Sequence, residues 1–259
     1  MNFDIPEDIQ EIINALKQFI NKVVIPLEEE NHDLLYNERN YYLENGRRHP
    51  RVEELRKQVR KESAKAGFYT MFGAQELGGE EFGPVASLLV NEALDKNFPN
   101  RKLIEAVVIP SPFTNGLTPV LKGLNQELKD RYLEGIGSGE KTLCFGLTEP
   151  DAGSDVWGIK TRAEKDGNDW VINGTKQWIT NAPYADYCLL FAVTNPELQE
   201  QRKGGITCFF VDTKSAGFTV DSVIATMGSL GGDAGIISLD NLRIPNENII
   251  GELDNGFTR

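Results

Sequence analysis

The sequence has few of the residues that build metal centres, disulfides and histidine-dependent active sites. Its only histidines are His32 and His49, and its three cysteines, Cys144, Cys188 and Cys208, form no C-x-x-C pair. Two separated histidines without neighbouring ligands predict surface side chains, and neither a metal site nor a Ser-His-Asp triad. An odd number of cysteines in apolar segments predicts buried, unreactive thiols rather than a disulfide framework, as suits a reducing compartment.

Positive charge and long apolar runs are also scarce. The chain has 27 Lys and Arg against 39 Asp and Glu, a formal net charge of −12. Such a surplus of carboxylates repels a phosphate backbone, so we expect no nucleic-acid partner. No apolar run reaches the roughly 20 residues that span a bilayer, and the acidic N-terminus lacks a signal-peptide core. We therefore expect no membrane insertion and a cytoplasmic protein, or a mitochondrial-matrix protein if it is a processed eukaryotic one.

The first half of the chain has the apolar spacing of helices. The length of 259 residues and the hydrophobic fraction of 40% allow one large domain or two smaller ones. The helical pattern begins at residues 9–23, where apolar side chains form one face, and Pro26 is expected to end or kink that helix. Residues 28–50 are highly charged and predict a loop or a solvated helix. Further helices are predicted at residues 52–66, 84–96 and 126–133.

From Lys141 onward, short β-type runs alternate with turn signals. The predicted strands are 143–147, 160–165, 170–172, 176–180, 187–193, 206–211, 218–223 and 236–242. Turns are predicted between them, including one at Asn173-Gly174. The fold class is therefore α+β: an all-helical N-terminal domain at 1–138 precedes an antiparallel β-barrel or sandwich at 139–250. Residues 251–259 are predicted to be a linker.

The sequence contains no P-loop, G-x-S-x-G or H-E-x-x-H motif. The candidates for a functional site are therefore two polar stretches, one around Glu149 and one around Trp178. Glu149 and Asp151 are close enough in sequence to form an acid/base pair, but carboxylates on such a turn more often accept hydrogen bonds from backbone N–H groups. Trp178 and Thr180 lie two residues apart, on one side of a predicted strand. An aromatic face beside hydroxyl groups suits a flat ligand with a polar edge, although Trp178 alone also fits an ordinary core position.

These stretches resemble a known family. Residues 147–155, LTEPDAGSD, and residues 172–181, INGTKQWITN, are similar to the two signature stretches of acyl-CoA dehydrogenases. The segments at 76–79, 137–140, 227–245 and 251–257 resemble the family as well. The resemblance implies bound FAD and three parts: a helical N-terminal domain, a middle β domain and a C-terminal helical bundle.

The resemblance also implies roles for individual residues. In the cofactor site, Thr148 would bond the pyrimidine end of the flavin, Trp178 would pack beside the ring and Thr180 would donate toward N5. Ser154 would contact the CoA portion of the substrate. The full set of implied cofactor-binding residues is Phe145, Leu147, Thr148, Trp178, Ile179 and Thr180. The implied reaction is α,β-dehydrogenation of an acyl-CoA, with electron-transferring flavoprotein as electron acceptor and a homo-oligomer as the assembled form.

The sequence departs from the family pattern in three places. The family's catalytic base lies in the C-terminal bundle, so we expect it beyond Arg259 and assign no catalytic residue within this chain, which alone is expected to be inactive. Many members carry an arginine and a serine where this chain has residues 230–234, LGGDA. The charged segment 28–50 is also long. Two alternatives remain open: a flavin-dependent monooxygenase or oxidase of the same fold, and a redox-inactive binding or assembly module.

Overall fold

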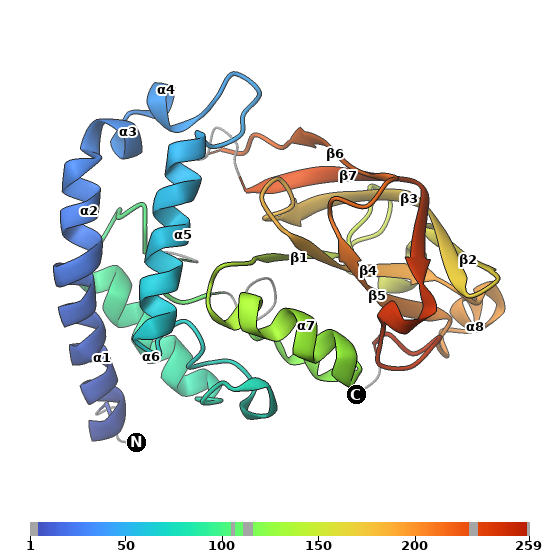
Figure 1. Cartoon of the computed structure of the whole chain (residues 1–259), viewed down its shortest axis with the longest axis horizontal. Coiled ribbons are helices and arrows are strands. Elements are labelled where there is room, and N and C mark those ends of the chain that lie inside the picture. Colours follow the sequence, from blue (N-terminus) through green and yellow to red (C-terminus); the bar gives the residue numbers. More distant parts are fainter. Residues whose placement is uncertain (1–4, 105–106, 111–115, 228–232, 258–259) are drawn as a thin grey trace.

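The computed structural model describes residues 5–104, 107–110, 116–227 and 233–257. Most helices gather on one side of the molecule and a twisted sheet on the other; α7 lies alongside the sheet, and the short α8 lies at the end of the sheet away from the other helices (Figure 1). The α-helices are α1 Glu7–Phe19, α2 Ile25–Glu30, α3 His32–Tyr36, α4 Glu38–Tyr41, α5 Pro50–Lys65, α6 Pro84–Asn97, α7 Gln126–Gly137 and α8 Pro196–Glu200. Short 3₁₀ turns occur at Gln75–Leu77, Pro119–Gly123, Val156–Gly158 and Asn246–Asn248. The α+β prediction is confirmed.

The first helical run continues past Pro26, so the prediction that the proline ends this helix is wrong, and a kink at this position stays a prediction. A single π-helical turn, Ile20–Val24, joins α1 to α2, and Pro26 lies within the first turn of α2. A proline is tolerated there because its missing N–H falls where the helical hydrogen-bond ladder is already interrupted. The buried face of this run forms the first core, together with α5 and α6.

The sequence predicted a loop or a solvated helix for the charged segment 28–50, but part of this segment is buried. Glu28 is fully buried at its start. One oxygen of its carboxylate accepts from the backbone N–H groups of Lys102 (2.8 Å) and Leu103 (2.7 Å). The other accepts from the hydroxyl of Tyr36 (2.8 Å) and the guanidinium of Arg101 (3.2 Å). Sequence charge alone did not reveal this role, because each partner lies on another element.

The second half forms one eight-stranded sheet. Its strands are β1 Leu143–Gly146, β2 Arg162–Asp166, β3 Asp169–Thr180, β4 Tyr187–Val193, β5 Ile206–Asp212, β6 Phe218–Val223, β7 Ala234–Pro245 and β8 Ile249–Ile250. The order is β6-β7-β3-β2-β4-β5-β8, with β1 also paired to β4. Most pairs are antiparallel, but β1 runs parallel to β4, with Cys144 opposite Cys188, and β2 meets β4 in a parallel pair as well. The expectation of an entirely antiparallel sheet is corrected at these two pairs.

Strands β4 and β5 are buried on both faces, which explains their continuous apolar sequences. On β4, alternate residues such as Leu189 and Phe191 belong to the core beneath α7, whereas Cys188 and Leu190 belong to the core that faces β3 and β7. The three cysteines are free and buried, as predicted.

The predicted turn at Asn173-Gly174 is absent, and β3 runs through it as one long strand. An irregularity in the pairing with β7 occurs at this point. Gly174 has a φ of +153° there, and a Cβ at this position would lie 2.4 Å from the hydroxyl oxygen of Thr161. The glycine is therefore needed for close approach of two backbones rather than for a reversal of the chain.

Helix α7 packs on the sheet, not on the other helices. Its buried residues Leu128 and Ile136 share a core with Leu143, Leu189 and Phe210. The packing therefore does not change at residue 138, where the sequence placed a domain boundary, and that boundary stays a prediction. Residues 251–257, predicted as a linker, lie against the sheet through hydrogen bonds such as the one from the Gly256 N–H to the Ile206 carbonyl (2.7 Å).

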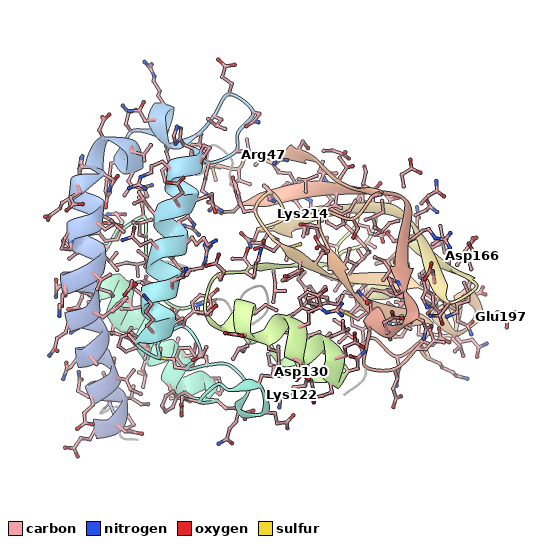
Figure 2. The ribbon with its side chains drawn as sticks, in the orientation of Figure 1. Arg47, Lys122, Asp130, Asp166, Glu197 and Lys214 are labelled. Atoms are coloured by element: carbon pink, nitrogen blue, oxygen red, sulfur yellow. The ribbon has the colours of Figure 1, made fainter. Side chains whose placement is uncertain are left out.

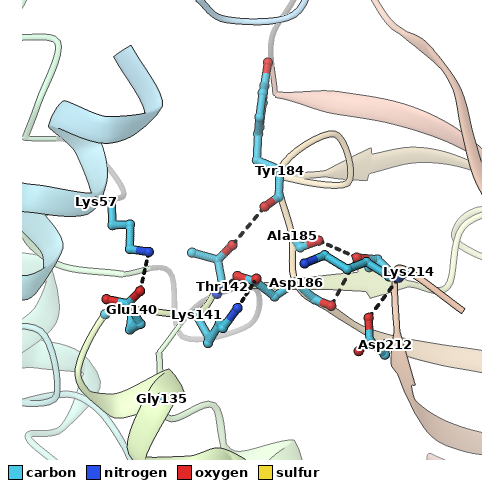
Figure 3. Close-up of polar contacts among 12 residues, drawn as sticks. Lys57, Gly135, Glu140, Lys141, Thr142, Tyr184, Ala185, Asp186, Asp212 and Lys214 are labelled. Carbon is cyan, nitrogen blue, oxygen red and sulfur yellow. Dashed lines mark hydrogen bonds and ion pairs between the residues drawn. The ribbon is translucent and has the colours of Figure 1, made fainter. Parts of the chain in front are cut away.

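Ion pairs and hydrogen bonds join the helices to the sheet region. Lys57 and Lys61 of α5 both pair with Glu140, just before β1; the Lys57 pair is drawn in Figure 3. Hydrogen bonds from these two lysines lower the pKa of Glu140 to about 2. At the other end of the junction, Arg47 lies close to the sheet (Figure 2) and donates to the Val220 carbonyl on β6 (3.3 Å).

Arg48 makes the most buried of these connections. Its guanidinium pairs with Glu53 of α5 and with Asp233 ahead of β7, each at 2.5 Å. It also stacks over the ring of Tyr184 at 3.9 Å, and its backbone N–H donates to the Tyr184 hydroxyl (2.7 Å). Burial alone would lower the pKa of Arg48, but the charges of Glu53 and Asp233 raise it, so the guanidinium stays charged.

Candidate functional site

One hydrogen bond brings the two polar stretches together. The backbone N–H of Gln177, near the end of β3, donates to the carbonyl of Thr148, just beyond β1, at 2.9 Å. A second contact lies at the other side, where the Asn181 side-chain amide donates to the Leu143 carbonyl (2.9 Å). Residues 143–148 and 177–181 therefore lie side by side.

Trp178 and Thr180 lie on the exposed side of this strand end, and Ile179 between them is buried. The predicted shared face of Trp178 and Thr180 is confirmed. The alternative that Trp178 is a core aromatic is wrong, because 52% of its surface is accessible. Ile179 needs a correction in the opposite direction: its side chain belongs to the core between the strands, so only its backbone can meet a ligand on the exposed face.

The backbone at Trp178 is strained. Its φ is +62°, in the left-handed region, and the pairing of β3 with β7 is irregular between Lys176 and Ile179. A non-glycine residue in that region costs about 1–2 kcal/mol. A strained backbone that holds a large aromatic ring half exposed is typical of a binding site, where such strain is retained for function.

The residues predicted on the β1 side lie partly buried. Phe145 packs against Phe191, with ring centroids 4.8 Å apart, and Leu147 and Thr148 are half buried. Within the described part of the chain, the hydroxyl groups of Thr148 and Thr180 make no side-chain hydrogen bond, so both remain available as donors. An apolar floor and two free hydroxyls suit a flat ligand with a polar rim.

Ser154 lies apart from that group, on the exposed loop between β1 and β2. The loop is closed at its start by paired hydrogen bonds between Glu149 and Ala152, and near its middle Asp155 pairs with Arg202 (2.7 Å). The structure therefore holds this loop on the surface, and contact of Ser154 with a substrate stays a prediction.

Glu149 and Asp151 do not form an acid/base pair. Glu149 is buried, and its carboxylate accepts from the backbone N–H groups of Lys160 (2.6 Å) and Thr161 (3.0 Å) and from the Lys176 amine (2.7 Å). Asp151 is exposed and pairs with the Lys160 amine (2.7 Å). The role that the sequence favoured, acceptance of backbone N–H groups, is confirmed for Glu149, whereas Asp151 pairs only with a side chain.

Sequence reasoning missed Lys176, whose side chain is fully buried beneath the site. The strand pattern did indicate its burial: Lys176 is an even number of residues from Trp170 and Ile172, so alternation places all three on one face of β3, and Trp170 and Ile172 point into the core. Desolvation lowers the pKa of Lys176, although the charge of Glu149 raises it. For Glu149, burial would raise the pKa, but Lys176 and the backbone donors lower it overall.

Other site types find no support in the described residues. No group of three or more His, Cys, Asp or Glu side chains there is arranged to hold a metal ion. His32 is exposed and His49 half buried, as predicted, and the Nδ1 of His49 accepts from the Arg51 N–H at the start of α5. No helix found among residues 5–257, outside the gaps, is both long and apolar enough to cross a membrane. Of the departure expected at residues 230–234, residues 230–232 fall outside the described residues, whereas Asp233 pairs with Arg48 and Ala234 begins β7.

The comparisons with known proteins agree with this geometry. The family model described as acyl-CoA dehydrogenase, middle domain, matches residues 144–242. Cyclohexane-1-carbonyl-CoA dehydrogenase of Syntrophus aciditrophicus is 31% identical over 97% of this chain and 59% of its own length. The caffeyl-CoA reductase–Etf complex subunit CarC of Acetobacterium woodii is 32% identical over 79% of this chain and 52% of its own length.

A solved structure shows the same arrangement of elements. The FAD complex of PigA superposes with a TM-score of 0.75 at 27% identity, over 99% of this chain and 61% of that one. The chain therefore spans between about half and three fifths of the length of these proteins. The match to the structure covers the helices as well as the sheet, whereas the family model covers the sheet from β1 to β7.

Proposed function

The chain belongs to the acyl-CoA dehydrogenase family, and from this membership we propose that residues 143–181 form the flavin-facing surface of an FAD-dependent acyl-CoA dehydrogenase. The observation that supports this most directly is the exposed, strained Trp178 beside Thr180, held against Thr148 by the Gln177 N–H. The name of the cyclohexane-1-carbonyl-CoA relative supports an acyl-CoA substrate, and the FAD complex of PigA supports the cofactor.

In this proposal, the side chains of the chain bind and orient the cofactor. Trp178 and the half-buried Leu147 provide apolar surface for the ring system, and the hydroxyls of Thr148 and Thr180 donate to its polar atoms. Phe145, which is half buried and packed on Phe191, contributes further apolar surface on the β1 side. Bound FAD supplies a two-electron acceptor for the hydride that leaves the β-carbon of the substrate. Ser154 is assigned to the CoA moiety.

Removal of the α-proton requires a base within hydrogen-bond reach. We assign no such base among residues 1–259, because the family's base belongs to a helical bundle in the part of the relatives that this chain does not span. The Etf complex named for the relative of Acetobacterium woodii supports electron-transferring flavoprotein as the redox partner. We further propose a homo-oligomeric protein located in the cytoplasm, or in the mitochondrial matrix if it is a processed eukaryotic protein.

Titration of the purified chain with FAD tests the cofactor site. We expect saturable binding that quenches tryptophan fluorescence and that Trp178→Ala abolishes or weakens. The matched control is Trp157→Phe, since Trp157 lies on the surface loop before β2 and outside the proposed contact. Equal FAD affinity in wild type and Trp178→Ala would refute the assignment of Trp178. Absence of any FAD binding by the wild-type chain would refute the proposed flavin-facing surface at residues 143–181.

The class of reaction needs a separate test on flavin-loaded protein. Anaerobic bleaching of the flavin by a saturated acyl-CoA supports the dehydrogenase. Oxygen consumption that depends on another substrate, without such bleaching, supports the monooxygenase or oxidase alternative. A protein that binds FAD and shows neither reaction fits the redox-inactive module.

A further inference from the structure

A buried ion pair lies directly beneath the contact that joins β1 and β3. The Lys176 amine and a Glu149 carboxylate oxygen are 2.7 Å apart, and the two side chains are 0% and 5% exposed. The same amine donates to the Leu147 carbonyl at 3.1 Å. The carboxylate accepts from two consecutive backbone N–H groups, those of Lys160 and Thr161. The pair therefore ties together three segments: the end of β1, the segment before β2, and β3.

This pair lies next to three backbone features of the exposed surface: the bond between Gln177 and Thr148, the irregular strand pairing and the left-handed residue Trp178. Gln177, the residue after Lys176, makes the hydrogen bond to Thr148, the residue before Glu149. The irregularity in strand pairing begins at Lys176, and the left-handed Trp178 follows two residues later. A shift of either charged side chain would therefore move Thr148 and Trp178 relative to each other.

Net stability alone gives little reason for two buried charges at this point. Removing a charged pair from water carries a large desolvation penalty, and well-packed apolar residues of similar volume are often as stabilising. What an ion pair with fixed backbone partners adds is geometry, because each donor and acceptor has a defined direction. Here the three donors around Glu149 and the two acceptors of Lys176 define where the segments meet.

We propose that Lys176 and Glu149 are positioning residues: together they set the spacing between Thr148 and Trp178 on the exposed surface without touching a ligand. The assignment of FAD as the ligand rests on the proposed function. The positioning of Trp178 does not, so the two can be tested separately.

The first experiment follows Trp178 without any ligand. The chain has three tryptophans, so 5-fluorotryptophan labelling gives three ¹⁹F resonances, and Trp178→Phe identifies the one of interest. We expect Glu149→Gln and Lys176→Met each to shift or broaden the Trp178 resonance. The matched control is Asp151→Asn, which breaks the exposed Asp151–Lys160 pair on the same loop. That variant should leave the resonance in place, because exposed pairs contribute little.

A single variant leaves one buried charge without its partner, so it can fail to fold. In that case the double variant Lys176→Met with Glu149→Gln takes its place, since it buries no unpaired charge. An unmoved Trp178 resonance in any folded variant that lacks the pair would overturn the proposal. Loss of thermal stability with an unchanged resonance would show a merely structural role and overturn it as well.

The second experiment measures FAD affinity in the same variants. We expect Glu149→Gln and Lys176→Met to weaken binding by about tenfold or more, whereas Asp151→Asn leaves it unchanged. We also expect the double variant to weaken binding about as much as each single variant, because the two residues act as a unit. If wild type binds no FAD but the Trp178 resonance still moves, the proposed function fails and the positioning role stands. If FAD affinity is unchanged although the resonance moves, positioning for the cofactor is refuted.

Discussion

The left-handed backbone at Trp178 predicts an unusual ranking of two variants, Trp178→Ala and Trp178→Gly. Both remove the same ring, which is about half buried. Since a buried tryptophan removes roughly 150–250 Å² from water, each variant loses contacts over about 100 Å². At about 25 cal/mol per Å² the shared loss of stability is about 2.5 kcal/mol.

The two variants differ in the strain at φ +62°. Alanine retains a Cβ and its penalty of about 1–2 kcal/mol in the left-handed region, whereas glycine carries none. The greater freedom of glycine in the unfolded chain offsets part of this advantage, by about 0.4–1 kcal/mol. We therefore expect Trp178→Gly to be more stable than Trp178→Ala by about 1 kcal/mol.

Urea unfolding of the two variants measures this difference as a shift in midpoint at equal slope, on the order of 0.4 M. Leu88 offers a matched control, because it is similarly exposed but lies within α6. There the order should reverse, with Leu88→Ala more stable than Leu88→Gly by about 1 kcal/mol. Equal or greater stability of Trp178→Ala would show that the strain is absent. FAD affinity should be weak in both Trp178 variants.

Two further predictions concern the frame around the site. Gly174→Ala should destabilise the fold by about 2 kcal/mol in urea unfolding, because the new Cβ would lie 2.4 Å from the Thr161 hydroxyl oxygen, at a φ of +153°. Gly153→Ala is the neutral control, because a Cβ there meets no atom within 4 Å. Equal effects of the two substitutions would contradict this reasoning. The pKa of Glu149 is lowered in the fold, so the folded protein resists protonation of this carboxyl and loses stability as pH falls below the unfolded value of about 4.3. Glu149→Gln should therefore show a shallower decline of unfolding free energy on acidification, and an identical slope in both proteins would count against a charged Glu149.

Much of the architecture followed from sequence periodicity. The strand limits predicted at 187–193 and 218–223 agree with β4 and β6, and the burial of β5 on both faces agrees with its apolar run at 208–211. These features depend on local alternation or on continuous hydrophobicity, which a single sequence displays directly. The turn predicted at Asn173-Gly174 is absent, although this dipeptide is a strong local turn signal. The glycine is required there because Thr161, on another segment, leaves no room for a Cβ.

The burial of the charged side chains Glu28 and Lys176 was not predicted from the sequence. Glu28 reads as one of three consecutive glutamates, and only the fold brings Lys102, Leu103 and Arg101 to its carboxylate. Lys176 is similar, because its buried position follows strand parity but its partner does not. A charge becomes tolerable in a core only when donors or acceptors from distant segments surround it, and sequence spacing does not encode such encounters.

The sequence by itself determined the class of fold and the two polar stretches at 147–155 and 172–181. Hydrophobic periodicity and short motifs are local properties, so they can be read before folding. Only the tertiary structure decided that these stretches meet, through the Gln177 N–H and the Thr148 carbonyl. It also decided that Trp178 is strained and that Lys176 and Glu149 lie buried beneath it. Those properties depend on contacts between segments far apart in the chain, which exist only once the sheet has formed.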